Sequence, residues 1–589
     1  SEDQVTYIRN HEEIRRMRRN NFQRLLELGG GRRFRAERFV PHEERFTFGE
    51  DAMDLKAALT FDPERARHYF DQGWWGDDTL RSWLARHVAE RPGHPAIVHG
   101  ERVLSYAELG AEVDRLAGAL WRLGIRKGDV VALQLPNIPE YLIAYLAICQ
   151  MGAVMTTVYM PHRASEFLTL LGHSKARAII CLSDAGGFAA AETLVGLQPQ
   201  LPALEHVIAL GAPVAGAESY QDLIGAGDSI EGNAEAVPVA ADPMVLLYTS
   251  GTTASPKGAP HNYHLMLSNA RLGVPEHRIG PDDIFLSAAP YGHLFGLYSL
   301  TLAICVGATN LMLPMFSPPA LAETIQAGRP TVMLAAPAHI AACLGAGLFD
   351  RYDISSLKLA ILSGSAVPPD LARAFDEKLV NGKVNQLWGM TELQAGMYAR
   401  PGDSLEVATA TAGRPPPGAE VRVVDEDNNP VPPGVEGHLQ ARGCHVIPGY
   451  LRNPEANAEA FTADGWFRSG DLAVQDAAGN TAITGRSKEI INRGGVKYNP
   501  RDVEDLLDKH PKIAQSALVP MPDPVLGERA CCFAVAAPGE QPSLAELCDY
   551  LLCHDIAKTK LPERLELIEE MPLTPTRKII KGRLVARLG

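Results

Sequence analysis

A loop rich in hydroxyl side chains and glycine, residues 248–260 (YTSGTTASPKGAP), has the composition of a polyphosphate-binding segment. It follows an apolar run, residues 244–247, that favours a strand. Glycines let backbone amides approach phosphate oxygens, hydroxyls donate hydrogen bonds, and Lys257 adds a positive charge. Because Lys257 precedes Gly258, the segment is not the G-x-x-x-x-G-K-[ST] loop of the P-loop NTPases. Taken alone, the stretch fits a phosphate loop or a Ser/Thr-rich surface loop about equally.

Four later segments hold side chains that suit nucleotide binding and acid activation. They are residues 385–393 (NQLWGMTEL), 465–473 (GWFRSGDLA), 485–500 (GRSKEIINRGGVKYNP) and 572–584 (PLTPTRKIIKGRL). The side chains of interest are Trp388, Gly389, Thr391, Glu392, Asp471, Arg486, Lys488 and Lys578. An aspartate suits ribose because both of its oxygens accept hydrogen bonds. The cations suit a reaction that brings a carboxylate onto a polyphosphate.

In order and character, these segments resemble the adenylate-forming superfamily, which includes acyl-CoA synthetases, aryl-acid–AMP ligases, peptide-synthetase adenylation domains and firefly-type luciferases. The resemblance runs from about Leu104 to the end of the chain, and it is closest in character to small-acid CoA ligases of the cyclohexanecarboxylate or benzoate type. It implies a two-step reaction with ATP, Mg²⁺ and CoA. A carboxylate attacks the α-phosphate to give acyl-AMP and pyrophosphate, and a thiol then attacks the acyl carbonyl and releases AMP.

The resemblance also implies roles for the ATP-binding residues. The loop over the β- and γ-phosphates would comprise Thr249, Ser250, Gly251, Thr252, Thr253 and Lys257. Glu392 would bind magnesium, Thr391 would face the phosphates, and Trp388 with Gly389 would lie at adenine. Asp471 would accept hydrogen bonds from the ribose, with Arg486 in support. The family usually has glycine where Ala254 stands, so an altered loop mobility is expected.

The C-terminal residues would act in both steps. Lys578 matches the family's lysine that contacts the α-phosphate and the attacking carboxylate, although Arg577 stands where the family has glycine. Lys488 matches the hinge residue about which the small domain rotates between the two half-reactions. Gly494 and Gly495 would then face the pantetheine tunnel for CoA.

The acyl pocket is expected around residues 289–297 (APYGHLFGL), with His293 at its gate and Leu294 beside it. The remaining wall would come from Ser363, Gly364, Ser365 and Met390. The region has no aspartate to bind an α-ammonium group, which argues against α-amino acids. Leu294 stands where catechol-acid ligases have asparagine, and leucine cannot satisfy a buried hydroxyl, which argues against dihydroxybenzoate. The expected substrate is therefore a compact apolar acid of the alicyclic, simple aromatic or short branched type.

Composition is that of a globular protein, with 46% hydrophobic and 21% charged residues among 589. The net charge of −14 argues against a general nucleic-acid binder, so local cations must meet any bound anion. The nine cysteines lack zinc-ligand spacing and fit reduced core thiols, which favours the cytoplasm. His261 and His264 are expected to be core or pocket-side histidines, because no third metal ligand is evident.

Seven apolar runs alternate with amphipathic stretches and predict an α/β fold. We expect an N-terminal extension (1–50), a large domain of layered α/β subdomains with a small β-barrel-like subdomain (51–485), and a small mobile α+β domain (486–589). The uncharged stretch 294–316 predicts a buried helix followed by a strand at 310–313 and no membrane span, because Gly307 and Pro314 interrupt it.

The sequence leaves the thiol acceptor and the oligomeric state open. The preferred function is an AMP-forming acid–thiol ligase that uses CoA. The alternatives are a stand-alone ligase that loads a carrier protein, a protein that has lost catalysis, and a luciferase-like oxygenase.

Overall fold

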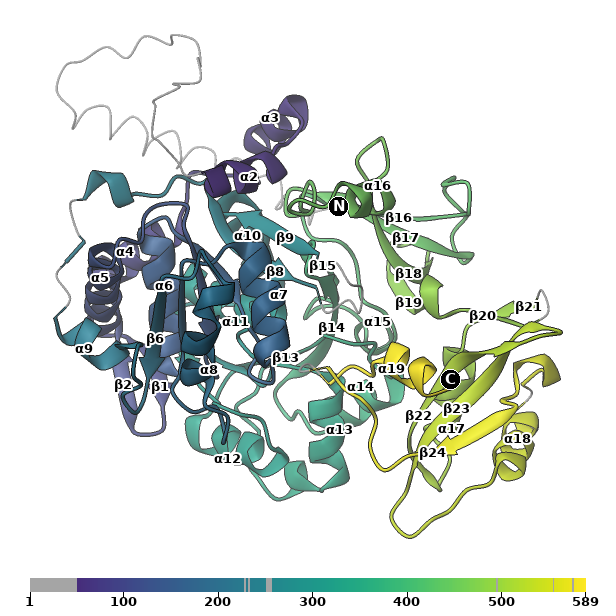
Figure 1. Cartoon of the computed structure of the whole chain (residues 1–589). Helices are drawn as coiled ribbons and strands as arrows, with labels where there is room; N and C mark the ends of the chain where they lie inside the picture. The colour runs from purple at the N-terminus through teal and green to yellow at the C-terminus, as the bar shows by residue number, and fades with distance from the viewer. Residues whose placement is uncertain are drawn as a thin grey trace, which may run out of the picture. The chain divides into compact units, whose positions relative to one another are not determined.

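The computed structural model describes residues 50–226, 229–230, 233–249, 257–493, 496–554, 556–574 and 577–588 (Figure 1). All of them belong to the compact unit that runs from Phe48 to Gly589. The predicted N-terminal extension, apart from Glu50, lies outside the described residues, as do residues 250–256 of the phosphate loop.

The first sheet has seven strands in the order β7-β6-β5-β3-β4-β8-β9. The neighbours are parallel except for β8 and β9, which pair antiparallel around the predicted phosphate loop. The bounds are β3 Val130–Gln134, β4 Val154–Thr157, β5 Ala178–Leu182, β6 His206–Leu210, β7 Glu218–Ser219, β8 Pro243–Tyr248 and β9 Gly258–Asn262.

The second sheet has eight strands in the order β15-β14-β13-β12-β10-β11-β1-β2. Its interior is parallel, and the outermost pair at each edge is antiparallel. The bounds are β1 Pro95–His99, β2 Arg102–Ser105, β10 Ile284–Ser287, β11 Thr309–Leu311, β12 Val332–Ala335, β13 Leu359–Leu362, β14 Lys383–Met390 and β15 Gln394–Tyr398.

Helices connect the strands and cover the sheets. They are α2 Glu50–Ala58, α3 Pro63–Asp71, α4 Leu80–Glu90, α5 Tyr106–Arg122, α6 Pro139–Gln150, α7 Ala164–Ser174, α8 Ala190–Leu197, α9 Tyr220–Gly225, α10 Tyr263–His277, α11 Leu294–Val306, α12 Pro318–Gly328, α13 Pro337–Gly345, α14 Pro369–Asp376 and α15 Leu405–Ala410. One core cluster contains side chains of both sheets together with α5, α6, α10 and α11. Helices α6 and α11 are apolar on nearly every side, which is why both lie inside this core.

The predicted alternation is confirmed, since each of the seven apolar runs forms a strand: β3, β5, β6, β8, β10, β12 and β13. The uncharged stretch from residue 294 forms the buried helix α11 and then β11, as predicted. Within the part of the chain that the structure describes, no helix has both the length and the apolar character that a membrane crossing requires.

The predicted β subdomain is a four-stranded antiparallel sheet in the order β16-β17-β18-β19. Its strands are β16 Ala419–Val424, β17 Glu436–Gly443, β18 Phe467–Gln475 and β19 Thr481–Arg486, with helix α16 Pro454–Ala460 between β17 and β18. The proposed domain boundary at 485/486 falls at the end of β19.

The C-terminal part is α+β. Its sheet has the order β21-β20-β23-β22 with β24 beside β23: β20 Ile491–Arg493, β21 Val496–Tyr498, β22 Ile513–Asp523, β23 Gly527–Ala536 and β24 Arg564–Leu567. The helices are α17 Arg501–Leu507, α18 Leu544–Cys553 and α19 Lys581–Val585. Strands β20 and β21 form an antiparallel pair. Helix α17 buries Val503 and Leu507, and Pro500 is its N-cap residue.

Short 3-10 turns complete the chain: η1 Gln198–Gln200, η2 Ala234–Ala236, η3 Leu348–Asp350, η4 Ser487–Glu489, η5 Lys558–Lys560 and η6 Ala586–Leu588. Strands β8, β13 and β14 lead directly at their carboxyl ends into the predicted site residues Thr249, Ser363 and Thr391. Ligands of open α/β sheets bind at such carboxyl ends, so the topology itself gathers these residues.

Candidate active site

A cavity of about 760 Å³ collects most of the residues predicted from the sequence. The predicted residues that line it are Thr249, Lys257, His293, Leu294, Ser363, Gly364, Gly389, Met390, Thr391, Glu392, Arg486, Lys488 and Lys578. Segments more than 300 residues apart in the chain therefore contribute to one space, which has the size of a small-molecule site.

Other predicted residues lie elsewhere. Trp388, Asp471 and Ser365 are not among the lining residues. Trp388 and Asp471 are buried behind the wall, whereas Ser365 is exposed to solvent. Ser250, Gly251, Thr252 and Thr253 of the phosphate loop, and Gly494 and Gly495 of the CoA tunnel, lie outside the described residues, as does Ala254.

Four cationic side chains line the cavity although the chain is acidic: Lys257, Arg486, Lys488 and Lys578. Glu459 holds two of them, with Oε1 2.9 Å from Lys488 Nζ and Oε2 4.0 Å from Lys257 Nζ. The Lys488 side chain is 77% exposed, so its ion pair contributes little to stability. This cluster supplies the local positive charge that a bound polyphosphate would require.

A tight turn between β14 and β15 presents Met390, Thr391 and Glu392 to the cavity. Gly389 makes the turn possible, because a Cβ at this position would lie 2.0 Å from the carbonyl oxygen of Gln394. The buried His261 contacts the carbonyl oxygen of Thr391 through Nε2 at 2.7 Å. Burial lowers the pKa of His261 to about 4, so its imidazole is neutral and acts as a fixed support for the turn.

Glu392 is a buried carboxylate, and the hydroxyl of Tyr450 donates a hydrogen bond to its Oε1 at 2.7 Å. Burial raises the pKa of Glu392, while Tyr450 and the more distant Lys257 and Arg486 oppose that rise. A cation near this carboxylate would therefore stabilise its charged form. No group of three or more His, Cys, Asp or Glu side chains suited to a metal occurs among the described residues.

Trp388, Asp471 and Arg486 form a connected unit at the wall of the cavity. The indole Nε1 of Trp388 donates to Asp471 Oδ2 at 2.7 Å, and Arg486 Nε donates to Asp471 Oδ1 at 3.0 Å. The Trp388 ring lies in the core cluster beneath the β subdomain. Both carboxylate oxygens of Asp471 thus already have protein donors, and the unit orients Arg486, which does line the cavity.

Lys578 reaches the cavity from a tight turn near the end of the chain. The backbone amide of Arg577 donates to the Thr574 carbonyl oxygen at 2.8 Å, and the Lys578 amide donates to Thr574 Oγ1 at 2.9 Å. Arg577 has φ of +62°, the left-handed conformation in which a non-glycine residue costs roughly 1–2 kcal/mol. Arg577 therefore replaces the family's glycine at a position where the backbone conformation strains arginine but would not strain glycine.

We expect Arg577→Gly to keep the rate of acyl-AMP formation within about threefold of the parent, because glycine adopts a positive φ freely. Arg577→Val is expected to lower that rate about tenfold, because a β-branched side chain strongly disfavours this φ and the turn must distort, displacing Lys578. Initial rates of pyrophosphate release for the two variants check the expectation. Equal rates in the Val and Gly variants would show that the turn does not position Lys578.

Apolar side chains also line the cavity, among them Leu294 and Phe295 of helix α11. His293 is the N-cap of this helix, and its Nδ1 accepts from the Phe295 amide at 3.2 Å. Burial, together with the charge of Lys578, lowers the pKa of His293 to about 3. The ring of Tyr159 lies roughly parallel to the His293 ring with centroids 6.3 Å apart. A neutral imidazole and an aromatic ring thus lie side by side in the cavity wall.

Sequence reasoning missed several lining residues: Tyr159, Phe295, Tyr298, Leu387, Gln394, Ala395 and Tyr450. Three of the seven had an available signal, and the first is Leu387, which stands within the 385–393 segment. Phe295 stands within the 289–297 segment, and Tyr298 lies one helical turn beyond Leu294, on the same face of α11. Tyr159 and Tyr450 come from distant segments and join the site only through the tertiary fold.

Comparison with known proteins agrees with this arrangement. A family model described as AMP-binding enzyme matches residues 84–451, and one described as AMP-binding enzyme C-terminal domain matches residues 502–578. The chain is 32% identical over 535 residues to a medium-chain fatty-acid–CoA ligase of Escherichia coli, covering 90% of this chain and 94% of that protein. It is 35% identical over 550 residues to a salicyl-AMP ligase / salicyl-S-ArCP synthetase of Mycobacterium tuberculosis, covering 91% and 95%.

Among solved structures, the chain is similar to an anthranilate CoA ligase in complex with anthranoyl-AMP. The TM-score is 0.79 at 26% identity, and the match covers 87% of this chain and 97% of the ligase. The relatives thus include enzymes whose names give CoA as the acceptor and one whose name gives a carrier protein.

Proposed function

Because the chain belongs to the AMP-binding, adenylate-forming enzymes, we propose that it activates a compact carboxylic acid as acyl-AMP and transfers the acyl group to CoA. ATP-dependent acid activation is the activity of the family. The acid would have an apolar body, as in an alicyclic, simple aromatic or short branched acid. The products would be acyl-CoA, AMP and pyrophosphate, as for CoA ligases of the cyclohexanecarboxylate or benzoate type.

One observation carries this proposal: a single cavity is lined both by cationic and by apolar side chains. Lys257, Arg486 and Lys578 suit the phosphates of ATP. Leu294, Phe295 and Leu387 suit the body of an acid. In the first step an oxygen of the acid bonds to the α-phosphorus and the bond to pyrophosphate breaks. Lys578 would stabilise the negative charge that the two anions bring together.

The remaining nucleotide roles follow from the family motifs. Residues 249–253 would cover the β- and γ-phosphates, and Thr391 would donate to a phosphate oxygen. Arg486, which the carboxylate of Asp471 orients, would contact the ribose. Trp388 would support the adenine side of the site through its hydrogen bond to Asp471. Gly389 would lie beside the adenine as well, where it lets the backbone pass close to the carbonyl oxygen of Gln394.

Glu392 fits the magnesium ion that the family requires. Mg²⁺ prefers oxygen ligands and commonly takes one or two carboxylates together with substrate phosphates. Glu392 lines the cavity, and Tyr450 holds one of its oxygens in place. When bound, the ion would supply positive charge at the phosphate oxygens. Glu392 would hold the ion, while Lys257 and Lys578 contact the phosphates themselves.

The acid would lie between His293 and the apolar wall. Leu294, Ser363, Gly364 and Met390 all line the cavity. Small residues at 363 and 364 leave room for a ring, and Leu294 offers no partner for a hydroxyl next to the carboxylate. The exposed Ser365 would have no contact with the acid in this arrangement.

CoA is the preferred acceptor, and a carrier protein is the alternative. The similarity to a salicyl-S-ArCP synthetase favours the carrier protein, whereas the absence of a polar residue at Leu294 disfavours a hydroxybenzoate of that kind. In the second step Lys488 would act as the hinge of the small domain, 486–589, and Gly494 with Gly495 would face the pantetheine arm.

The substrate class is tested by pyrophosphate release with ATP and Mg²⁺ across a panel of acids. The panel contains benzoate, cyclohexanecarboxylate, salicylate, 2,3-dihydroxybenzoate, isobutyrate, octanoate and phenylalanine. Ring acids or the short branched acid should give the highest kcat/KM. A preference for octanoate, phenylalanine or dihydroxybenzoate would contradict the proposed pocket, and silence with every acid would favour a protein that has lost catalysis.

The pH dependence of acyl-AMP formation should report on Lys578. Burial lowers the pKa of Lys578, and Arg486 lowers it further, while Asp471 and Glu392 oppose the shift. The ammonium form is needed, so activity should be full at lower pH and fall as pH rises through a pKa below the ordinary lysine value of about 10.4. In Lys578→Arg, which stays protonated, this basic limb should vanish from the residual activity. Its persistence would assign the limb to another group.

A further inference from the structure

The wall of the cavity contains buried polar atoms that have no hydrogen-bond partner among the described residues. Tyr298 and Gln394 both line the cavity, and they are only 2% and 3% exposed. Neither the Tyr298 hydroxyl nor Gln394 Oε1 has a hydrogen-bond partner among the described residues. Buried polar groups in native proteins are nearly always bonded, so two such atoms on one cavity wall require an explanation.

More unpaired polar groups lie directly behind Tyr298, where α10, α11 and β15 meet. A Cβ built on Gly273 of α10 would lie 2.8 Å from the Tyr298 hydroxyl, 3.7 Å from the Tyr398 hydroxyl and 3.8 Å from the His277 ring. In the described structure the Tyr398 hydroxyl and both ring nitrogens of His277 also lack partners. Because residue 273 is glycine, no side chain fills the space beside these atoms.

The chemistry of this group is that of a neutral hydrogen-bonding site. Burial lowers the pKa of His277 to about 3, with a smaller contribution from Arg400, so its ring can donate at one nitrogen and accept at the other. The tyrosine hydroxyls likewise donate and accept, and Gln394 Oε1 accepts. A hydroxyl or amino group offers both functions and would satisfy several of these atoms at once.

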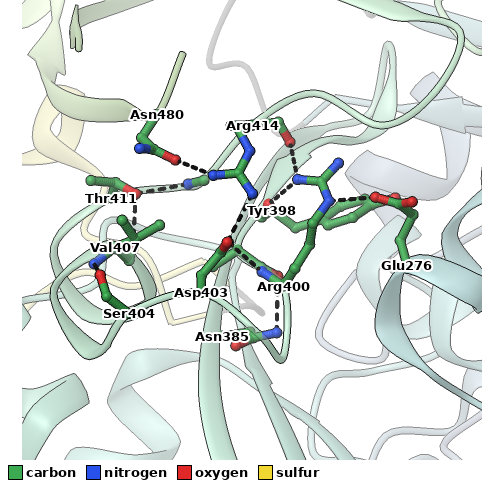
Figure 2. A network of polar contacts seen from close by, with 12 residues as sticks. Glu276, Asn385, Tyr398, Arg400, Asp403, Ser404, Val407, Thr411, Arg414 and Asn480 are labelled. Carbon is green, nitrogen blue, oxygen red and sulfur yellow. Dashed lines mark hydrogen bonds and ion pairs between the residues drawn. The ribbon is translucent and has the colours of Figure 1, made fainter. Parts of the chain in front are cut away.

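The surrounding contacts hold the group in position. Figure 2 shows Arg400 reaching the Tyr398 backbone and Glu276, and Arg414 joining Asp403 to Asn480. The guanidinium of Arg400 lies 5.2 Å from the centre of the Tyr398 ring, and the His277 ring lies 4.3 Å from it on centroids. Tyr398 therefore has a fixed place, which favours preorganised recognition over adaptation.

The spacing from the reacting end suits a ring. His293 is the N-cap of α11, and Tyr298 lies five residues further along, about 7.5 Å at 1.5 Å per residue. Leu294 and Tyr298 are four residues apart, so they share the face of α11 that lines the cavity. If the carboxylate of a ring acid lies near His293, a substituent on the opposite side of the ring lies near Tyr298.

We propose that the acid carries a hydroxyl or amino group at the end remote from its carboxylate, recognised by Tyr298 and Gln394 with Tyr398 and His277 behind them. This inference rests on the proposed function and narrows it: the body of the acid is apolar and its far end is polar. An acid without the group leaves the buried atoms unpaired, and a site built for a hydroxyl rejects the analogue that lacks it.

The test compares matched acids in pyrophosphate release: benzoate with 4-hydroxybenzoate and 4-aminobenzoate, and cyclohexanecarboxylate with its 4-hydroxy derivative. We expect kcat/KM to favour the substituted acids at least about tenfold. Tyr298→Phe removes one oxygen and should abolish that preference by slowing the substituted acids, while the parent acids change less than about threefold.

Tyr145→Phe is the matched control. Tyr145 is a buried tyrosine whose hydroxyl also has no partner in the described structure, but it does not line the cavity. It should leave the preference unchanged. Thermal unfolding gives a readout apart from rate: with ATP present in both cases, adding 4-hydroxybenzoate should raise the Tm of the parent above its value with ATP alone, but should not raise that of the Tyr298→Phe variant.

The outcomes separate this inference from the function on which it rests. Equal kcat/KM for the substituted and parent acids, or a preference that survives Tyr298→Phe, overturns the inference while the ligase assignment stands. Failure of every acid to release pyrophosphate overturns both.

Discussion

Replacing Lys578 with alanine is expected to slow acyl-AMP formation by roughly a hundred- to a thousandfold while leaving thioester formation from supplied acyl-AMP within about threefold of the parent. The structure brings this lysine into the same cavity as Thr391, Glu392 and His293. Its loss would remove a preorganised charge from the step in which two anions meet. The second step joins a neutral carbonyl to a thiol, and we propose that it uses a different position of the small domain.

The two half-reactions are measured separately, as acid-dependent pyrophosphate release and as acyl-CoA formed from synthetic acyl-AMP. Lys558→Ala is a suitable control, because Lys558 is an exposed lysine of the same C-terminal part and does not line the cavity. It should leave both rates unchanged. An equal loss of both half-reactions in Lys578→Ala would contradict the assignment of this lysine to adenylation and of the hinge to domain rotation.

The second large effect is expected for Glu392→Gln, which should lower acyl-AMP formation at least about a hundredfold and raise the Mg²⁺ concentration needed for half-maximal rate. Glutamine has nearly the same shape and can still accept from the Tyr450 hydroxyl, so the change removes mainly the charge. A neutral amide is a weaker ligand for a hard cation than a carboxylate. A magnesium titration of pyrophosphate release measures both effects.

Tyr450→Phe serves as the graded control for Glu392→Gln. It keeps the carboxylate and removes the one hydroxyl that holds Oε1, so a smaller loss of about tenfold is expected, in line with a hydrogen bond to a charged group. A Glu392→Gln variant that retains the magnesium dependence of the parent would show that another group holds the ion.

The motifs allowed much of the cavity to be predicted because they lie at the ends of strands that the hydrophobic pattern also predicts. The runs that form β8 and β13 lead directly into Thr249 and Ser363, whereas β14, which leads into Thr391, was not among the predicted runs. A parallel sheet places such ends at one edge, so order along the chain was enough to group them. The same reasoning extended to His293 and Leu294, where a buried helix begins.

What the sequence could not supply is the pairing of side chains across the fold. Tyr450 and Glu392 are 58 residues apart, and no local pattern links them. The indole of Trp388 was predicted at the adenine, whereas in the structure it lies in the core and donates to Asp471. Three elements contribute the Tyr298 and Tyr398 hydroxyls and the His277 ring nitrogens, which have no hydrogen-bond partner among the described residues. Only the packing of these side chains around Gly273 reveals them as a group.

At Arg577, the effect of replacing the family's glycine can be judged only from the backbone conformation. The sequence shows arginine where the family has glycine, which by itself suggests either an added charge or a stiffened loop. The positive φ at this position identifies backbone strain as the relevant quantity, and the strain lies next to Lys578.

The central claim is that one active site makes acyl-AMP and passes the acyl group to CoA. Its most direct test is a single reaction containing a ring acid from the panel, ATP, Mg²⁺, CoA and a holo-carrier protein, with every acylated product quantified by mass spectrometry. The account predicts acyl-CoA and AMP in equal amounts, with the carrier left unacylated. Acylation of the carrier without acyl-CoA would contradict it and would identify the protein as a carrier-loading ligase.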